Sequence, residues 1–400
     1  MKKQKKPSRL GRPSRLLWFI AYLVFLPIVK LRYRLRVTKS FRGRLRGPAL
    51  VLAPHTAECD PFLIGYALYP ARPNYVVSAH LLAVPTIRRI FRILHVIPKR
   101  MFSADPSTIL NIGRAKREGN IVVLFPEGRL PCSGHSVPIA QGTDALIARL
   151  GIDVYVAACH GAYLTFPKWS KKVHRGKINV EVSRIFTAEE IPNLSIDEIS
   201  ARLSAAIAHN DEAAMRGIPY RCKNKAEGVD GILYRCPECE RELTLTASGD
   251  TIACECGHAA RLLPDYRMEG SRFATLGEWF LWQRENVDLD TPLTSPVRVG
   301  TPDEKGNMNE NAGEGVATLT REAITFRGTV DGAPLEFTIP TEKLGGLPIT
   351  VAKHFDVYYN NRLYYIYPLP DTRISVKWVV FFDKLLMERT AKIPALSETN

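Results

Sequence analysis

A histidine and an aspartate with four residues between them, His55 and Asp60, stand in the stretch LAPHTAECD at 52–60. Histidine is the natural general base at neutral pH, because its ordinary pKa lies near that value. A neighbouring carboxylate can fix the tautomer of the ring and stabilise the imidazolium that forms. The spacing lets a loop turn into a helix that returns Asp60 to His55, and Pro61 suits the first turn of such a helix. Spacing alone is weak support, because a solvated histidine near a helix-capping aspartate gives the same pattern.

A second stretch with polar chemistry is LFPEGRLPCSG at 124–134. Glu127 can bind a hydroxyl or a cation, and Arg129 can bind phosphate. Gly128 between them would let backbone N–H groups approach a substrate closely. An ordinary Pro-Glu-Gly turn is the alternative interpretation of the same residues.

Elements that could position both stretches alternate along residues 47–218. The expected buried strands are 48–54, 74–79, 120–126 and 153–159. Apolar residues at helical spacing mark PTIRRIFRILHVI and PSTILNIGRAKREG between them, and QGTDALIARLG ends in a helix-stopping glycine. The alternation predicts an α/β sheet with helices over its faces, and the polar stretches fall just past strand ends, where open sheets of this kind bind ligands.

The chain resembles the glycerophospholipid acyltransferases, the family that includes the 1-acylglycerol-3-phosphate acyltransferases. The first block of that family is H-x4-D, matched by His55 and Asp60, and its third block is F-P-E-G followed by arginine, matched by 125–129. Its second block ends a β-type run with an arginine that binds the acceptor phosphate, matched by Arg100 in LHVIPKR. A fourth block, a later strand, corresponds to DVYVAAC at 153–159.

This resemblance implies a mixed β-sheet flanked by helices, and it implies a role for each matched residue. His55 would be the general base and Asp60 would orient it. The substrate-binding residues would be Arg100, Glu127, Gly128 and Arg129. The free hydroxyl of 1-acylglycerol-3-phosphate would attack the thioester of acyl-CoA or acyl carrier protein and give phosphatidic acid, with no catalytic cofactor.

Departures from the family pattern bear on the acceptor more than on the reaction. Lys99 stands where the family usually has an acid before the arginine, and Ser78 and His80 replace a usual lysine and acid. Another lysophospholipid or glycerol-3-phosphate therefore stays open as the acceptor. Because the mechanism needs no acyl-enzyme, Cys59 beside the histidine is expected to be a bystander.

The excess of positive over negative charge in the protein is confined to residues 1–46. This arm carries 15 of the 55 Lys and Arg, so the other 40 balance the 40 acidic residues, the first of which is Glu58. Its apolar run at 16–29 is shorter than the roughly 20 residues of a bilayer crossing and has basic flanks. We expect an uncleaved helix that lies on an anionic membrane surface, at the cytoplasmic face of the cell membrane. The alternatives are a true span, a signal peptide and a helix packed on the core.

Four of the eight cysteines form two close pairs, which is typical of a zinc ribbon. The expected ligands of a structural Zn²⁺ are Cys236, Cys239, Cys254 and Cys256. The second pair is unusually tight, so His258 or Cys222 could replace one ligand. Residues 220–268 contain seven basic and eight acidic residues, and this balance lacks the positive surface that nucleic-acid binding requires, so no nucleic-acid partner is expected.

The expected organisation has five parts. A basic membrane-associated helix (1–46) precedes the acyltransferase domain (47–218), and a zinc ribbon (219–268), an aromatic helix with a linker (269–315) and a β-rich domain with a C-terminal helix (316–400) follow. An alternative from another functional class is an inactive, membrane-tethered zinc-ribbon binding module. The four intact residues His55, Asp60, Arg100 and Glu127 argue against that alternative.

Overall fold

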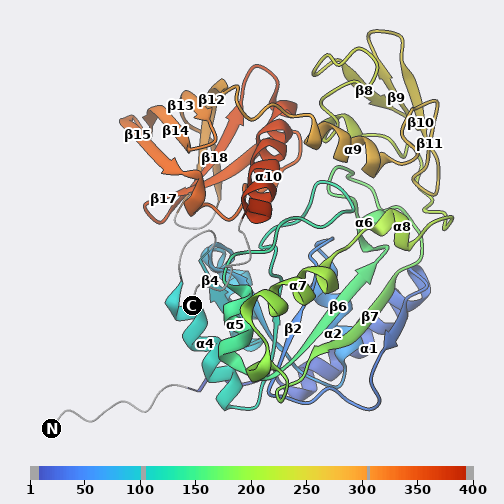
Figure 1. Ribbon diagram of the computed structural model, residues 1–400, viewed down its shortest axis with the longest axis vertical. Helices are drawn as coiled ribbons and strands as arrows, with labels where there is room; N and C mark the ends of the chain where they lie inside the picture. Colours follow the sequence, from blue (N-terminus) through green and yellow to red (C-terminus); the bar gives the residue numbers. More distant parts are fainter. Residues whose placement is uncertain (1–8, 101–104, 304–306, 393–400) are drawn as a thin grey trace, which may run out of the picture.

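The first domain is built on a seven-stranded sheet in the order β1-β7-β6-β2-β5-β3-β4, seen in a computed structural model that describes residues 9–100, 105–303 and 307–392 (Figure 1). Its strands are β1 (Arg36–Lys39), β2 (Ala49–Leu52), β3 (Asn74–Ser78), β4 (Ile97–Lys99), β5 (Ile121–Leu124), β6 (Asp153–His160) and β7 (Asn179–Phe186). Neighbouring strands are parallel except β6 and β7, so β7 and β1 run against the other five. The predicted mixed sheet flanked by helices is confirmed, and its central strands lie where the apolar runs indicated.

Helices cover both faces of this sheet (Figure 1). The helices of this domain are α1 (Arg15–Arg32), α2 (Asp60–Leu68), α3 (Pro85–Ile93), α4 (Pro106–Arg117), α5 (Thr143–Leu150), α6 (Ala162–Thr165), α7 (Ile196–Ile207) and α8 (Asp211–Ala214). The alternation of side chains along β2 shows why both faces are needed. Ala49 and Val51 pack with α2, while Leu50 and Leu52 pack with α4, α5 and α7, so the strand is buried on both sides.

Helix α1 packs against α2 through aromatic rings and leaves much of its apolar surface exposed. Tyr22 stacks on Tyr69, with 3.7 Å between the ring centroids, and also contacts Tyr66. The large apolar side chains that stay exposed on α1 include Leu16, Leu17, Phe19, Ile20, Leu23, Val24, Ile28 and Leu31. Among the residues that the structure describes, no helix combines the length and apolar character that a membrane crossing needs.

The cysteine segment (219–268) forms a second sheet in the order β11-β10-β9-β8. Its strands are β8 (Leu245–Ser248), β9 (Thr251–Cys254), β10 (Ala259–Leu262) and β11 (Met268–Glu269), and the helix α9 (Leu276–Glu285) follows. The hydroxyl of Tyr266 donates to the Leu164 carbonyl at 2.8 Å, and the hydroxyl of Tyr220 donates to the Lys177 carbonyl at 2.7 Å. These contacts hold the segment onto the first domain.

The C-terminal domain (293–392) is a seven-stranded antiparallel sheet in the order β15-β14-β13-β12-β18-β17-β16, with one helix packed on it. Its elements are β12 (Leu293–Pro302), β13 (Met308–Leu319), β14 (Ala323–Val330), β15 (Ala333–Pro340), β16 (Ile349–Thr350), β17 (His354–Tyr359), β18 (Arg362–Pro368) and α10 (Ser375–Lys392). Asn360 and Asn361, both at positive φ, form the expected hairpin turn between β17 and β18.

Two strands replace the linker that the composition of 290–315 suggested. Most of that stretch lies in β12 and β13, so the β-rich domain begins at Leu293 rather than at residue 316. Its glycines allow the backbone of β13 to lie close to the backbone of β14. A Cβ at Gly313 would lie 2.0 Å from the Thr329 carbonyl oxygen, and a Cβ at Gly315 would lie 2.4 Å from that of Arg327.

Helix α10 connects the three parts of the molecule. It lies between the C-terminal sheet and α9 (Figure 1), and its buried residues include Trp378, Phe381, Phe382 and Asp383. The same apolar core contains Cys132 and Tyr163 of the first domain and Cys236 of the cysteine segment. A helix that is buried on most sides needs partners around it, and here those partners come from all three parts.

Candidate active site

The polar residues of the site meet at one edge of the first sheet, because β2, β5, β3 and β4 are parallel. His55 follows the carboxyl end of β2, and Glu127 follows the carboxyl end of β5, its neighbour. Ser78 ends β3, and Lys99 ends β4 beside it. Parallel strands bring their carboxyl ends to a common edge, so residues 55, 78, 99 and 127 converge although they are far apart in the chain.

His55 and Asp60 form the pair that their spacing predicted. The Nδ1 atom of His55 lies 3.2 Å from Oδ2 of Asp60, the first residue of α2, and Asp60 is completely buried. The backbone N–H groups of Thr56 and Ala57 donate to the same oxygen at 2.6 and 2.9 Å. These donors stabilise the carboxylate, which can then only accept from Nδ1–H of His55. The other ring nitrogen, Nε2, is left with a lone pair for a proton.

Glu127 supports the histidine through the backbone rather than through the ring. Its Oε2 atom accepts the His55 backbone N–H at 2.9 Å, and only 2% of the residue is exposed. Burial raises the pKa of Glu127 to about 7, although the His55 N–H and the nearby His209 counteract the increase. The glutamate therefore holds the loop after β2 against the turn after β5.

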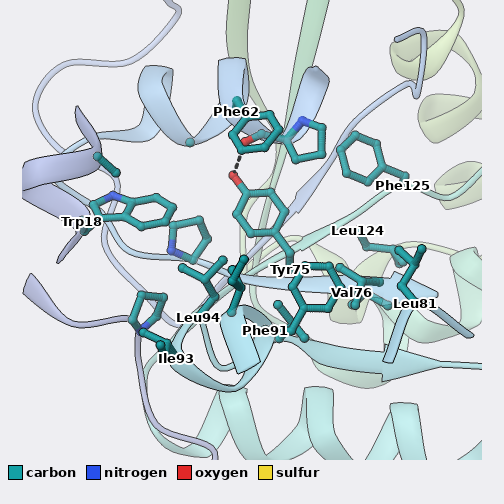
Figure 2. Close-up of a pocket in the computed structure, with 18 of the residues that line it drawn as sticks. Trp18, Phe62, Tyr75, Val76, Leu81, Phe91, Ile93, Leu94, Leu124 and Phe125 are labelled. Carbon is teal, nitrogen blue, oxygen red and sulfur yellow. Dashed lines mark hydrogen bonds between the residues drawn. The ribbon is translucent and has the colours of Figure 1, made fainter. Parts of the chain in front are cut away.

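A cavity of about 760 Å³ runs from this edge between α1, α2 and α3. His55, Phe125 and Gly128 line one end, and the walls are almost entirely apolar. Figure 2 shows the rings of Trp18, Phe62 and Phe91 around Tyr75, whose hydroxyl donates to the Pro61 carbonyl at 2.8 Å. A cavity of this size and character suits an apolar ligand with a reactive group at the histidine.

Lys99, and not Arg100, is the cation that lines the cavity in the described part of the chain. Burial lowers the pKa of Lys99, and the charge of Asp105 counteracts that decrease. Arg100 follows with an exposed side chain, while its backbone N–H donates to Asp105 at 2.8 Å. The sequence drew attention to Lys99 only as a departure from the family pattern.

Gly128 and Arg129 are adjacent in the chain, but Gly128 faces the cavity and Arg129 faces the protein interior. Gly128 lines the cavity at φ +70°, and its N–H donates to the Phe125 carbonyl at 3.2 Å, which closes the turn. Arg129 points away into the protein, where its guanidinium is paired with Asp383 of α10. Both side chains of this pair are less than a tenth exposed. Arg129 is therefore engaged with the C-terminal domain and does not reach a substrate in the cavity.

Two residues that the sequence did not single out stand behind the site. Asp211 accepts the N–H groups of Gly161 and Tyr163 at 2.6 and 2.9 Å, and Nε2 of His209 lies 2.8 Å from it. His209 is buried, and its charge lowers the pKa of Glu127. No motif marked this His-x-Asp pair, because it lies beyond the four family blocks and influences the site through the pKa of Glu127.

Cys59 is placed beside the pair but not in the cavity lining. Burial raises the pKa of its thiol, and the adjacent charge of Asp60 raises it further. A thiol that stays protonated is a poor nucleophile. Its surroundings thus agree with the expected role of a bystander.

The four paired cysteines converge in the cysteine segment. The Sγ atoms of Cys236, Cys239, Cys254 and Cys256 lie within 4.8 Å of one another, so together they can hold a metal ion. Cys222 and His258, the alternatives left open by the spacing, are not part of this group in the described residues. The His258 ring instead packs edge-on against Trp279, with 5.9 Å between centroids.

Comparison with known proteins assigns the first domain to a family. The family model described as Acyltransferase matches residues 34–160, from the residues before β1 to the end of β6. Among solved structures, the chain is similar to the 1-acyl-sn-glycerophosphate (LPA) acyltransferase PlsC from Thermotoga maritima, at 16% sequence identity and a TM-score of 0.39, with 48% of this chain and 78% of that chain covered. The resemblance that the sequence blocks indicated is confirmed by the family model: residues 34–160 form an acyltransferase domain.

Proposed function

We propose that the protein transfers a fatty acyl group from a thioester, acyl-CoA or acyl carrier protein, to the free hydroxyl of 1-acylglycerol-3-phosphate, which gives phosphatidic acid. The observation that carries the proposal is the His55–Asp60 pair at the end of a long apolar cavity. The cavity accommodates acyl chains, and the pair supplies the base that an alcohol needs to attack a thioester. An intact pair also counts against an inactive binding module.

The reaction needs one general base that later acts as an acid. Nε2 of His55 takes the proton of the acceptor hydroxyl as its oxygen attacks the thioester carbonyl. Asp60 keeps Nδ1–H directed toward itself and stabilises the imidazolium that forms. The tetrahedral intermediate then expels the thiolate, which takes the proton back from His55, so the products are an ester and a free thiol. Cys59 forms no covalent intermediate in this scheme.

Recognition of an anionic acceptor falls to Lys99 in this proposal. Lys99 lines the same cavity as His55, and a partly buried cation binds a phosphate more strongly than a solvated one. Arg100, next in the chain, can add to the positive potential at this end of the cavity from its exposed position. Other phosphorylated lysolipids carry the same group and remain alternative acceptors.

We further propose that α1 binds the cytoplasmic face of an anionic membrane. One side of α1, with Trp18 and Tyr22, lines the cavity, and the other side exposes apolar residues such as Ile20. Ile90 and Ile93 of α3 are exposed beside the cavity as well. An apolar surface of this kind suits the membrane interface, and Arg15, Lys30 and Arg32 at the ends of α1 would contact anionic headgroups.

The cysteine cluster is proposed to hold a structural Zn²⁺. Two of its Sγ–Sγ distances, 3.8 Å for Cys236–Cys256 and 3.7 Å for Cys239–Cys254, fit the edges of a tetrahedron of thiolates at about 2.3 Å from zinc. Zinc would fix the turns that carry the cysteines, and free thiols that bind metal are typical of a reducing compartment.

Replacement of His55 tests the proposed mechanism. We expect His55→Ala to lower kcat by about 10²- to 10⁴-fold, because general-base assistance contributes on that order. Cys59→Ala should keep kcat near the wild-type value, since no acyl-enzyme forms. Steady-state kinetics with purified protein, labelled acyl-CoA and 1-acylglycerol-3-phosphate give both numbers, and near-normal turnover by His55→Ala would exclude the assigned base.

Replacement of the two adjacent cations tests acceptor recognition. Lys99→Gln should raise KM for 1-acylglycerol-3-phosphate about 10-fold or more, since a charge-assisted contact is lost. Arg100→Gln should raise it less, because its side chain is exposed. A monoacylglycerol without phosphate serves as the control acceptor, for which Lys99→Gln should change KM little. A larger increase in KM for Arg100→Gln than for Lys99→Gln would instead show that Arg100 binds the phosphate.

Membrane binding is tested by two substitutions at matched exposure. Ile20 on α1 and Ile196 on α7 are 46% and 45% exposed. Ile20→Glu should weaken binding to phosphatidylglycerol-containing vesicles several-fold, because a charge replaces an inserted apolar side chain, while Ile196→Glu should leave it unchanged. Co-sedimentation measures both, and equal binding by the two variants would contradict insertion of α1.

Metal analysis tests the cysteine cluster. Purified protein should contain close to one equivalent of zinc, and removal by a chelator should lower the melting temperature, because the metal contributes folding free energy. Cys239→Ser should lose the metal, whereas Cys222→Ser, outside the cluster, should retain it. Less than about half an equivalent in the wild type would count against a zinc site.

A further inference from the structure

The C-terminal domain contacts the acyltransferase domain next to the proposed site. Arg129 follows Gly128, the glycine that lines the cavity, and its Nη2 donates to Oδ1 of Asp383, 254 residues further along the chain. The two side chains are 3% and 6% exposed. Nη1 of Arg129 has no hydrogen-bond partner among the described residues, so Asp383 is the contact that neutralises this buried cation there.

The segment that begins at Arg129 is also held by two hydrogen bonds to the residues that follow. Nζ of Lys168 donates to the Leu130 carbonyl at 3.3 Å, and the hydroxyl of Tyr163 donates to the Cys132 carbonyl at 2.8 Å. Cys132 and Tyr163 belong to the same buried core as most of α10. The backbone after Gly128 is therefore held by contacts within the first domain and by the ion pair between Arg129 and α10 of the C-terminal domain.

A second contact reaches the part of the cavity lining that follows β3. The hydroxyl of Tyr358, in β17, lies 3.3 Å from Nδ1 of His80, which also lies 2.7 Å from Oγ of Ser78. Ser78 and Leu81 line the cavity on either side of this histidine. The C-terminal domain thus contacts the segments that follow two strands of the first sheet, β5 through Arg129 and β3 through His80.

We propose that Asp383 is a positioning residue for acyl transfer, which holds Arg129 and through it the turn that carries Glu127 and Gly128. This inference rests on the proposed function. Glu127 accepts the N–H of His55, so a displaced turn displaces the base as well. Catalytic groups must be held to within a fraction of an ångström, and a misplacement of about 1 Å can cost 10²-fold in rate.

The test must separate positioning from stability, because removal of Asp383 alone leaves an unpaired buried cation. Two apolar residues in place of a buried ion pair are often as stable as the pair. In the full-length protein, the double variant Arg129→Met/Asp383→Leu should therefore melt within about 3 °C of the wild type. We expect its kcat to fall about 10- to 100-fold while KM for the acceptor changes less than threefold.

A matched control comes from the same helix. Lys377 of α10 pairs with Glu242 of the cysteine segment at 2.8 Å, away from the site, and Lys377→Met should keep the wild-type kcat. Wild-type kcat in a double variant that is as stable as the wild type would overturn the inference and make the ion pair purely structural. If the double variant is unstable, Arg129→Lys serves in its place, since it keeps the charge but loses the geometry of the guanidinium.

Hydrogen exchange gives a second measurement that does not depend on turnover. Exchange of the backbone amides of 125–134 should become faster in the double variant and stay unchanged in Lys377→Met. If the wild type transfers no acyl group to any lysolipid, the proposed function fails, and the exchange data still decide whether Asp383 holds the turn. Unchanged exchange at 125–134 in the double variant would show that it does not.

Discussion

The hydrogen bond from the His55 backbone N–H to Glu127 joins two loops that the sequence separates by 72 positions. It requires β2 and β5 to be parallel neighbours, so that both loops leave the sheet at the same edge. Everything else at the site depends on that constraint. The helix α2 begins where Asp60 can reach back to the ring, and the cavity opens beside the ring because Phe125 and Gly128 follow β5 there.

Burial makes this small constellation rigid. Asp60 and Glu127 are both inside the protein, and each accepts hydrogen bonds from backbone N–H groups. Such donors are part of the fold and need no reorganisation during the reaction. His55, in contrast, keeps 22% of its side chain accessible, as its proposed role of general base requires.

The sequence predicted the parts of the site that are local. The spacing of His55 and Asp60, the turn at Glu127 and the central apolar strands could be read directly, because each depends on neighbours in the chain. It could not predict the partner of Arg129, because an arginine can equally well bind a phosphate at the surface or pair with a buried carboxylate. The Gly- and Pro-rich stretch at 290–315 was interpreted as a linker, because composition does not reveal that its glycines lie where two paired strands approach closely. The sequence could not predict that Lys99 lines the cavity, because this depends on the pairing of β4 with β3.

The pairing of Arg129 with Asp383 has a consequence for the newly made chain. Synthesis proceeds from the N-terminus, so every strand of the first sheet leaves the ribosome long before α10 does. Until then the guanidinium of Arg129 lacks the carboxylate that neutralises it in the folded protein, and the core around Tyr163 lacks the aromatic residues of α10. The acyltransferase domain therefore gains its final packing only after the C-terminal domain has been made.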